Sequence, residues 1–118
     1  MSKLRHYETM FIVKPTLTEE ETAAQIDGIK AIIEKNGGEI VQCDNMGSQQ
    51  LAYEIEKHKR GYYYLVYFKG EPAGIAEIER NYRINENIMR FIFIKYENKK
   101  EIAAWTYMCG EAAKKESK

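Results

Sequence analysis

The strongest strand signal in the sequence is Tyr62-Tyr63-Tyr64-Leu65-Val66-Tyr67-Phe68, where every position holds an aromatic, β-branched or long apolar side chain. Successive side chains of a strand point to opposite faces of its sheet. One face of this strand would carry Tyr62, Tyr64, Val66 and Phe68, and the other Tyr63, Leu65 and Tyr67. A sheet covered on one face alternates apolar with polar residues, so this stretch predicts a sheet with two apolar faces.

The segment before this strand predicts its hairpin partner. Residues 39–46 form a predicted strand, Gly47 indicates a bulge or a bend, and residues 51–55 continue the extended chain. Residues 56–61 combine acidic and basic side chains with a glycine, which predicts a charged loop. The two strands are therefore expected to form a hairpin around this loop.

The N-terminal part of the chain predicts a strand followed by a helix. Residues 5–13 are rich in β-branched and aromatic side chains and end before a proline. Thr18 and Glu21 have the spacing of a capping box, and isoleucines at helical spacing predict a helix over about residues 18–35. Gly37 suits the left-handed conformation that ends a helix.

The C-terminal part completes a recognisable order of elements. Gly70-Glu71-Pro72 opens a second predicted helix, and residues 88–96 form a fourth predicted strand. The order β-α-β-β-α-β is that of the ferredoxin-like motif. We expect an α+β domain over residues 1–96, with two helices on one face of a four-stranded antiparallel sheet. Residues 97–118 form a charged C-terminal tail, for which a short helix and a mobile segment both remain open.

Length, charge and cysteine content limit the function classes. The 118 residues suffice for one domain, and a formal net charge of +0 gives no overall basic field, so nucleic-acid binding must rely on local patches. The sequence has neither an apolar run of the roughly 20 residues that cross a bilayer nor a signal-peptide pattern, so we expect a cytoplasmic protein without a membrane partner. Cys43 and Cys109 lack metal-ligand spacing and are expected to be free thiols, with a disulfide as the alternative.

The sequence offers no constellation for catalysis. Its two histidines, His6 and His58, lie far apart, and it contains neither a Gly-rich phosphate loop nor a cluster of metal ligands. We therefore expect no enzyme, cofactor, metal or small-molecule substrate. A ligand-binding or catalytic module stays open as an alternative, because the ferredoxin-like fold hosts many functions.

The second apolar face of the sheet is expected to bind a protein partner, because monomers seldom leave such a patch open. In the strand over 88–96 the alternation sets Met89, Phe91 and Phe93 against Ile88, Ile92 and Ile94. The alternative is that the tail folds back and covers this face with Trp105 and Met108. The expected partner surface consists of Met10, Ile12, Tyr63, Leu65, Tyr67, Ile92 and Ile94.

Basic residues gather at strand ends and on the hairpin loop, where they suit phosphate oxygens. The segment Arg60–Tyr67 also resembles the aromatic third-strand motif of RNA-recognition domains, with Tyr63 in place of its small residue. This motif favours, as an alternative function, a stand-alone module that stacks single-stranded RNA on its third strand. The candidate RNA-binding residues are Arg5, Lys57, Arg60, Arg90 and Lys95.

A set of motifs spread over residues 4–96 resembles the bacterial small-subunit ribosomal protein number six family. The motifs are Arg5-His6-Tyr7-Glu8, Pro15, Asn36-Gly37-Gly38, Gly47, Leu51-Ala52-Tyr53-x-Ile55, Lys57, Gly61-Tyr62-Tyr63 and Arg83-x-x-x-Asn87-Ile88-x-Arg90. The Leu-Ala-Tyr-x-Ile segment followed by Gly-Tyr-Tyr is the most specific of them.

The resemblance implies a non-catalytic ribosomal protein. It implies a heterodimer with small-subunit ribosomal protein number eighteen, and binding of the pair to the central domain of the small-subunit (16S) ribosomal RNA. It also implies that Arg5, Lys57, Arg90 and Lys95 occupy basic family positions that meet RNA. The chain departs from the family at Ser48-Gln49-Gln50, where basic residues are usual, so a weaker RNA contact is expected there.

Overall fold

The antiparallel sheet of the computed structural model has the strand order β2-β3-β1-β4. The structure describes residues 4–116, so the first three residues of the expected domain and the last two of the expected tail lie outside the described part. Within that part the elements are β1 (Arg5–Val13), α1 (Glu19–Lys35), β2 (Glu39–Ile55), β3 (His58–Gly70), α2 (Pro72–Ile84), β4 (Ile88–Tyr96) and α3 (Lys99–Glu116).

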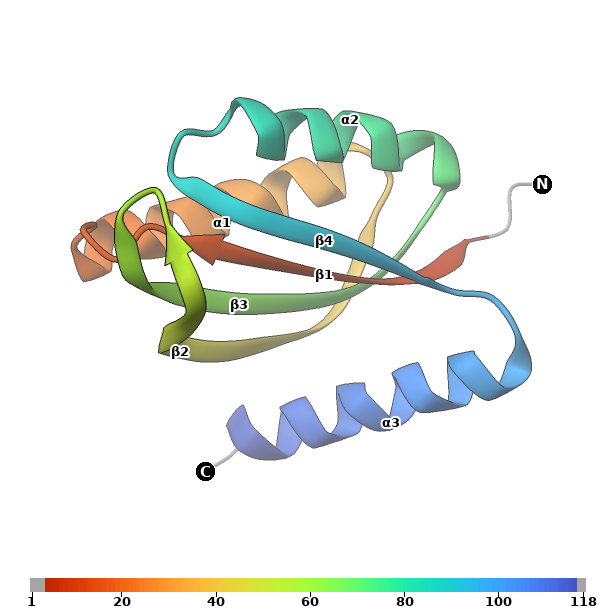
Figure 1. Cartoon of the computed structure of the whole chain (residues 1–118). Coiled ribbons are helices and arrows are strands. Elements are labelled where there is room, and N and C mark those ends of the chain that lie inside the picture. Colours follow the sequence, from red (N-terminus) through yellow and green to blue (C-terminus); the bar gives the residue numbers. More distant parts are fainter. Residues whose placement is uncertain (1–3, 117–118) are drawn as a thin grey trace.

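The helices lie on both faces of this sheet. Figure 1 shows α1 and α2 above one face and α3 below the other. The predicted ferredoxin-like order is confirmed, and so is the placement of its two helices on one face. The tail adds a third layer, because it forms a helix of 18 residues rather than a short one.

Helix α1 begins and ends at the residues that its capping signals indicate. The Thr18 hydroxyl accepts the backbone N–H of Glu21 at 3.1 Å, and the Glu21 carboxylate accepts the N–H of Thr18 at 3.0 Å. At the other end Gly37 has a φ of +87°, and the N–H of Gly38 donates to the carbonyl of Ile33 at 2.8 Å. This is the arrangement of a Schellman motif, in which glycine carries the left-handed residue.

The β2–β3 hairpin is longer and its turn tighter than the sequence predicts. Strand β2 extends to Ile55, with a register shift between Gln50 and Ile55, and β3 already begins at His58, so the expected loop of 56–61 shrinks to Glu56 and Lys57. Both turn residues have a positive φ, +48° and +69°, as two-residue hairpin turns often require. Gly47, with a φ of +74°, lies at a register shift in β2, which confirms the predicted bulge.

The main core fills the space between the sheet and helices α1 and α2. Tyr82 of α2 lies at its centre, where its hydroxyl shares a hydrogen bond of 3.0 Å with the Thr9 hydroxyl. The third strand turns its Tyr64, Val66 and Phe68 side chains to this core. The buried members are Tyr7, Phe11, Val13, Ile26, Ile29, Ile33, Tyr64, Val66, Phe68, Ile78, Tyr82 and Ile88.

A bulge in β4 corrects the predicted alternation of that strand. Val13 pairs with Ile88 and Ile12 pairs with Arg90, so Met89 is an extra residue between the two pairs. As a result Ile88 turns to the main core, whereas Met89 packs against Ile12 on the opposite face. A strict period of two would place Met89 on the same face of the sheet as Phe91. The extra residue of the bulge moves the side chains that precede it to the opposite faces.

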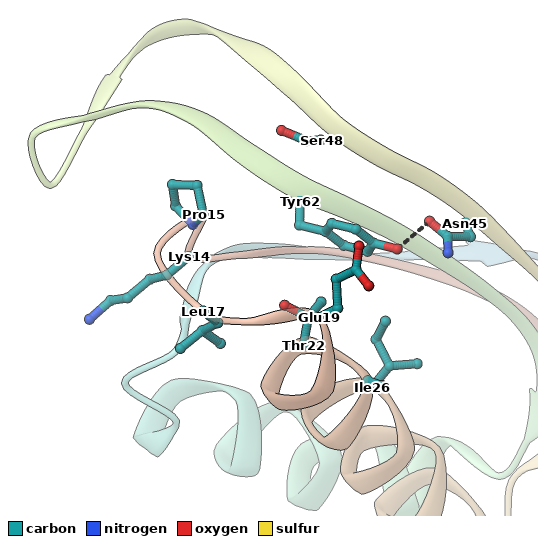
Figure 2. A pocket seen from close by; sticks show the side chains of 10 residues that line it. Lys14, Pro15, Leu17, Glu19, Thr22, Ile26, Asn45, Ser48 and Tyr62 are labelled. Atoms are coloured by element: carbon teal, nitrogen blue, oxygen red, sulfur yellow. Dashed lines mark hydrogen bonds between the residues drawn. The ribbon is translucent and has the colours of Figure 1, made fainter.

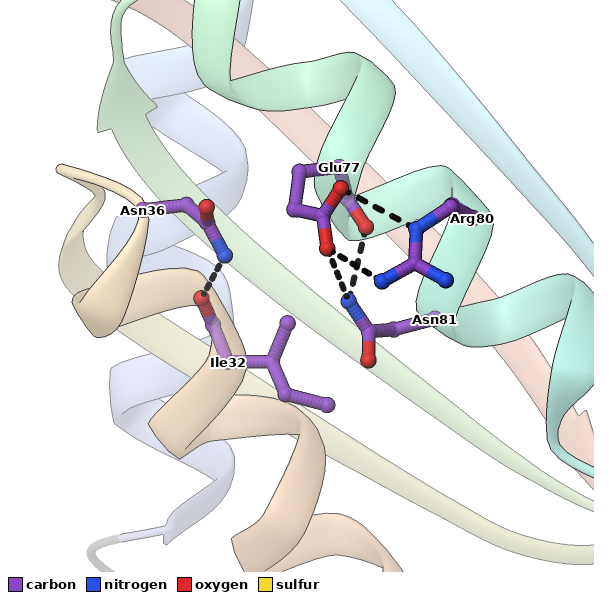
Figure 3. Close-up of polar contacts among 5 residues, drawn as sticks. All are labelled: Ile32, Asn36, Glu77, Arg80 and Asn81. Atoms are coloured by element: carbon purple, nitrogen blue, oxygen red, sulfur yellow. Dashed lines mark hydrogen bonds and ion pairs between the residues drawn. The ribbon is translucent and has the colours of Figure 1, made fainter.

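Helix α2 approaches the end of α1 closely. Figure 3 shows this region, with Asn36 donating to the Ile32 carbonyl at 2.8 Å and Glu77 of α2 accepting hydrogen bonds from Arg80. A Cβ atom at Gly74 would collide with the carbonyl oxygen of Asn36. The two helices can therefore pack at this distance because residue 74 has no side chain.

Two glycine-to-alanine substitutions in helices should change stability in opposite directions. Gly74→Ala should lower the free energy of unfolding by about 1–3 kcal/mol, because the added methyl group forces α2 away from Asn36. Gly28→Ala in α1 should raise it by about 0.5–1 kcal/mol, because the new Cβ would meet no described atom within 4 Å apart from its chain neighbours and the adjacent backbone of α1, and alanine favours the helix. Urea unfolding measures both values, and a stabilising Gly74→Ala would contradict the close approach.

Candidate nucleic-acid and protein interfaces

The structure divides the five candidate RNA-binding residues between the two ends of the sheet. Arg90 pairs with Ile12 near the end of β1, whereas Lys95 pairs with Tyr7 near its start. A strand rises about 3.3 Å per residue, so the five steps from Arg90 to Lys95 span roughly 17 Å. The hairpin-end group comprises Lys57, Arg60 and Arg90, and the tail-end group comprises Arg5 and Lys95.

The hairpin-end group surrounds the tip of the β2–β3 hairpin. Arg60 donates to the Ser48 hydroxyl at 3.3 Å and to the Ser48 carbonyl at 3.1 Å, which holds its guanidinium against β2. Arg90 donates to the Met89 carbonyl at 2.8 Å. A guanidinium has five N–H donors, so both arginines keep donors for phosphate oxygens. Lys57 occupies the left-handed turn and is exposed.

A pocket of about 340 Å³ adjoins this group. Arg83, which is not among the five candidate RNA-binding residues, lines it together with Arg90. Arg83 also forms an ion pair with Glu79 at 2.9 Å. Its place in the Arg83-x-x-x-Asn87-Ile88-x-Arg90 motif is the sequence signal for it. The full lining is Glu56, Tyr82, Arg83, Ile88, Met89, Arg90 and Phe91.

The tail-end group is partly neutralised. Lys95 forms an ion pair of 2.7 Å with Glu97, and this contact lowers the pKa of the Glu97 carboxyl. Arg5 lies near enough to affect the same carboxyl. The two cations of this group therefore share a nearby acid, whereas Arg60 and Arg90 at the other end contact a hydroxyl and backbone carbonyls.

The expected partner surface divides into three parts. The hairpin folds over Ile12 and Tyr63, which form the hairpin cluster with Leu51, Ile55 and Met89. Helix α3 covers Leu65 and Tyr67, as the alternative of a folded-back tail predicts, and the role of these two residues in a partner surface stays a prediction. Ile92 and Ile94 form the open strip, with exposed fractions of 45% and 38%. The α3 cluster is Leu65, Tyr67, Trp105, Cys109 and Ala112, flanked by Met10, Tyr96 and Met108.

Trp105 is the anchor of α3. Its indole N–H donates to the Tyr7 carbonyl at 2.9 Å, and its ring meets the edge of His6 with centroids 4.7 Å apart. Tryptophan suits this place because it combines a large apolar ring with one donor. The helix starts at a second capping pair, in which Asn98 accepts the N–H of Glu101 at 2.8 Å. The Asn98-x-x-Glu101 spacing is the sequence signal for this helix start.

A carboxylate lies beneath α3. Glu8 is 8% exposed and accepts the Tyr96 hydroxyl at 2.9 Å. Burial raises the pKa of Glu8, and burial together with the Glu8 charge raises the pKa of Tyr67 to about 12 and that of Cys109 to about 11. All three pKa shifts have the same cause, because a negative charge is poorly solvated between the sheet and α3.

The Glu8 carboxyl should make stability depend on pH. Because its pKa is higher in the folded chain, its contribution is present below the unfolded pKa and is lost as pH rises through the folded pKa. The free energy of unfolding of Glu8→Gln should therefore fall less than that of the wild type between pH 4.5 and 7. Urea titrations across this range measure the difference, with exposed Glu86→Gln as the control. Parallel profiles for the wild type and Glu8→Gln would contradict this assignment.

The aromatic residues of β3 do not form an open stacking platform. Tyr64 is buried in the main core, and Tyr63 packs on the hairpin cluster. The Tyr62 hydroxyl donates to Asn45 at 2.7 Å and borders a cleft of about 500 Å³ between the start of α1 and the hairpin, as Figure 2 shows. The alternative of a stand-alone module that stacks RNA on this strand is therefore not supported.

Ser48, Gln49 and Gln50 form a strand segment beside the hairpin-end group. Gln50 pairs with Arg60 across the hairpin, and Gln49 donates to the Met46 carbonyl at 3.1 Å. The uncharged departure from the family pattern is thus adjacent to the basic residues.

Both cysteines are free thiols. No helix in the described part of the chain is long and apolar enough to cross a membrane.

Comparisons with known proteins identify relatives of this chain. The sequence profile of the family described as Ribosomal protein S6 matches residues 6–95. The small ribosomal subunit protein bS6 of Helicobacter hepaticus (strain ATCC 51449 / 3B1) is 58% identical over 112 residues, which cover 95% of this chain and 82% of that protein. The protein of the same name from Campylobacter concisus (strain 13826) is 55% identical over 106 residues, 90% of this chain and 76% of that protein. The crystal structure of 30S ribosomal protein S6 from Thermotoga maritima has a TM-score of 0.77 and 36% identity, and the match covers 79% of this chain and 88% of that chain.

Proposed function

The chain belongs to the ribosomal protein S6 family of the small ribosomal subunit, and from this membership we propose that it binds 16S ribosomal RNA together with small-subunit ribosomal protein number eighteen. Its role is structural and not enzymatic, and its place is the ribosome in the cytoplasm. The proposal concerns the two partners and the surfaces that meet them.

The main support for the proposed RNA contact is the hairpin-end group. Lys57, Arg60 and Arg90 gather at one end of the sheet although the formal net charge of the chain is +0. Arg60 and Arg90 are held by the backbone or by Ser48, so little side-chain freedom is lost when they contact phosphate. Such contacts fix the position of a protein on RNA without reading its sequence.

The zero net charge supports binding as a pair. A neutral chain attracts RNA weakly at long range, so a protein partner that adds contacts would raise the affinity of the pair. The open strip of Ile92 and Ile94 offers such a partner an exposed apolar contact on β4. The second apolar face continues from this strip to the residues under α3.

Titration of 16S ribosomal RNA tests this function directly. The chain should bind strongly in the presence of protein number eighteen, weakly in its absence, and less strongly as salt rises. An unrelated single-stranded RNA of equal length is the control and should bind poorly under both conditions. Equal binding of both RNAs without the partner would contradict the proposal.

A further inference from the structure

We propose that α3 is a displaceable cover of the partner-binding face, so that the protein partner binds across Leu65 and Tyr67 only after α3 has left them. This inference rests on the proposed function and deepens it by adding a regulatory step. The occupant of the face in the free protein is a segment of the same chain, and the helix therefore competes with the partner for one surface.

The competition follows from what α3 covers. Trp105, Cys109 and Ala112 pack directly on Leu65 and Tyr67, and Met10 is half-buried at the margin of the same contact. A second protein cannot touch these side chains while the helix lies on them. The open strip of Ile92 and Ile94 remains available on β4 and is the point where a partner would first contact this face.

Helix α3 lies outside the main core of the domain. The main core contains residues of β1, β3, β4, α1 and α2, and its buried members include none from α3 within the described part of the chain. The family profile ends at residue 95, before α3 begins at Lys99, whereas the alignment with the Helicobacter hepaticus protein covers 95% of the chain and so includes most of α3. The segment that forms α3 thus lies outside the match to the family profile but mostly inside the alignment with this relative.

The contact of α3 is built for reversible release. One large side chain, Trp105, anchors it, and the other buried members on the helix, Cys109 and Ala112, are small. The buried Glu8 carboxylate opposes the contact, because an ionised group loses hydration there. The connection consists of Glu97 and Asn98, so the helix can swing away without breaking a strand pair of the sheet.

Trp105→Ala tests the competition, with Tyr107→Ala as its matched control. Tyr107 is an aromatic residue of the same helix but is 68% exposed. Removal of the anchor should raise the rate of Cys109 alkylation relative to Cys43 and should tighten the binding of protein number eighteen about tenfold, because the open state becomes the main one. Tyr107→Ala should change neither quantity. Mass spectrometry of the two cysteine peptides reports the opening, and titration calorimetry reports the affinity.

Glu8→Gln provides a second test in the opposite direction. The neutral amide still accepts the Tyr96 hydroxyl but removes the buried charge, so α3 should dock more firmly. Cys109 should then react more slowly and the partner should bind more weakly than to the wild type. Because this substitution is expected to stabilise the folded chain, its result does not depend on whether Trp105→Ala folds.

The possible outcomes separate the inference from the proposed function. Suppose that Cys109 becomes reactive in Trp105→Ala but partner binding does not tighten. The proposal that α3 covers the partner-binding face is then wrong. Unchanged binding would show that α3 is irrelevant to the interface, and weaker binding would show that α3 is part of it. If neither the wild type nor any variant binds the partner, the proposed pairing is wrong and the inference falls with it. Tighter binding in Trp105→Ala and weaker binding in Glu8→Gln support both.

Discussion

Tyr82→Ala is expected to lower the free energy of unfolding by about 3–5 kcal/mol, a large fraction of the stability of a small domain. The side chain is 1% exposed. Its ring contacts Phe11, Phe91 and Phe93, with centroid distances of 5.7, 5.1 and 5.2 Å. The truncation would therefore open a cavity where α2 meets the sheet. Urea and thermal unfolding measure the change.

Two milder substitutions isolate the hydroxyl of Tyr82. Tyr82→Phe should lower the free energy of unfolding by about 1 kcal/mol, because Thr9 keeps its second hydrogen bond to the Ile92 carbonyl at 3.1 Å. Thr9→Val should lower it by about 1–3 kcal/mol, because the buried Tyr82 hydroxyl then loses its partner. If Tyr82→Ala is no worse than Tyr82→Phe, the ring is not the centre of the core.

The elements that the sequence predicts well are those with local signals. The start of α1 depends on Thr18 and Glu21, three residues apart, and its end on adjacent glycines. Gly47 marks the bulge in β2 by its own conformational freedom. Each of these features is decided within one turn or one strand, so a single window of sequence contains its cause.

The features that the sequence does not predict depend on distant contacts. The bulge at Met89 exists because Val13 and Ile12 of β1 pair with Ile88 and Arg90. Residues 58–61 extend β3 because β2 pairs with His58, Arg60 and Gly61, and this pairing overrides the loop preference of a charged segment. The position of α3 depends on Trp105 meeting the Tyr7 carbonyl, 98 positions away in the chain.

The same distinction applies to the candidate site. Residue type suffices to select Lys57, Arg60 and Arg90 as candidate phosphate ligands, but strand register is needed to separate them from Arg5 and Lys95. The apolar pattern of the strands likewise predicts a second apolar face of the sheet but does not indicate what covers it. The sequence names both candidates for that cover, a partner and the tail, and the choice between them requires the packing of α3.

Neutralising the hairpin-end group is expected to have the largest effect on RNA binding. In the presence of protein number eighteen, the triple variant Lys57→Gln, Arg60→Gln and Arg90→Gln should weaken binding of 16S ribosomal RNA roughly a hundredfold at physiological salt. Each lost phosphate contact should reduce the slope of log affinity against log salt by about 1, so the slope should fall by about 3. Filter binding across a salt series measures both quantities.

A second triple variant removes the same charge from other places. Lys35→Gln, Arg80→Gln and Lys100→Gln lie on α1, α2 and α3, and Arg80 is already paired with Glu77 at 2.6 Å. The affinity of this variant for 16S ribosomal RNA and its salt slope should stay close to those of the wild type, because Coulomb forces between exposed charges fade beyond a screening length of about 8 Å. The pair Arg5→Gln and Lys95→Gln should weaken binding less than tenfold, because Glu97 already offsets Lys95. If all three variants weaken binding equally, the RNA senses the total charge of the chain, and the hairpin-end group is not its contact site.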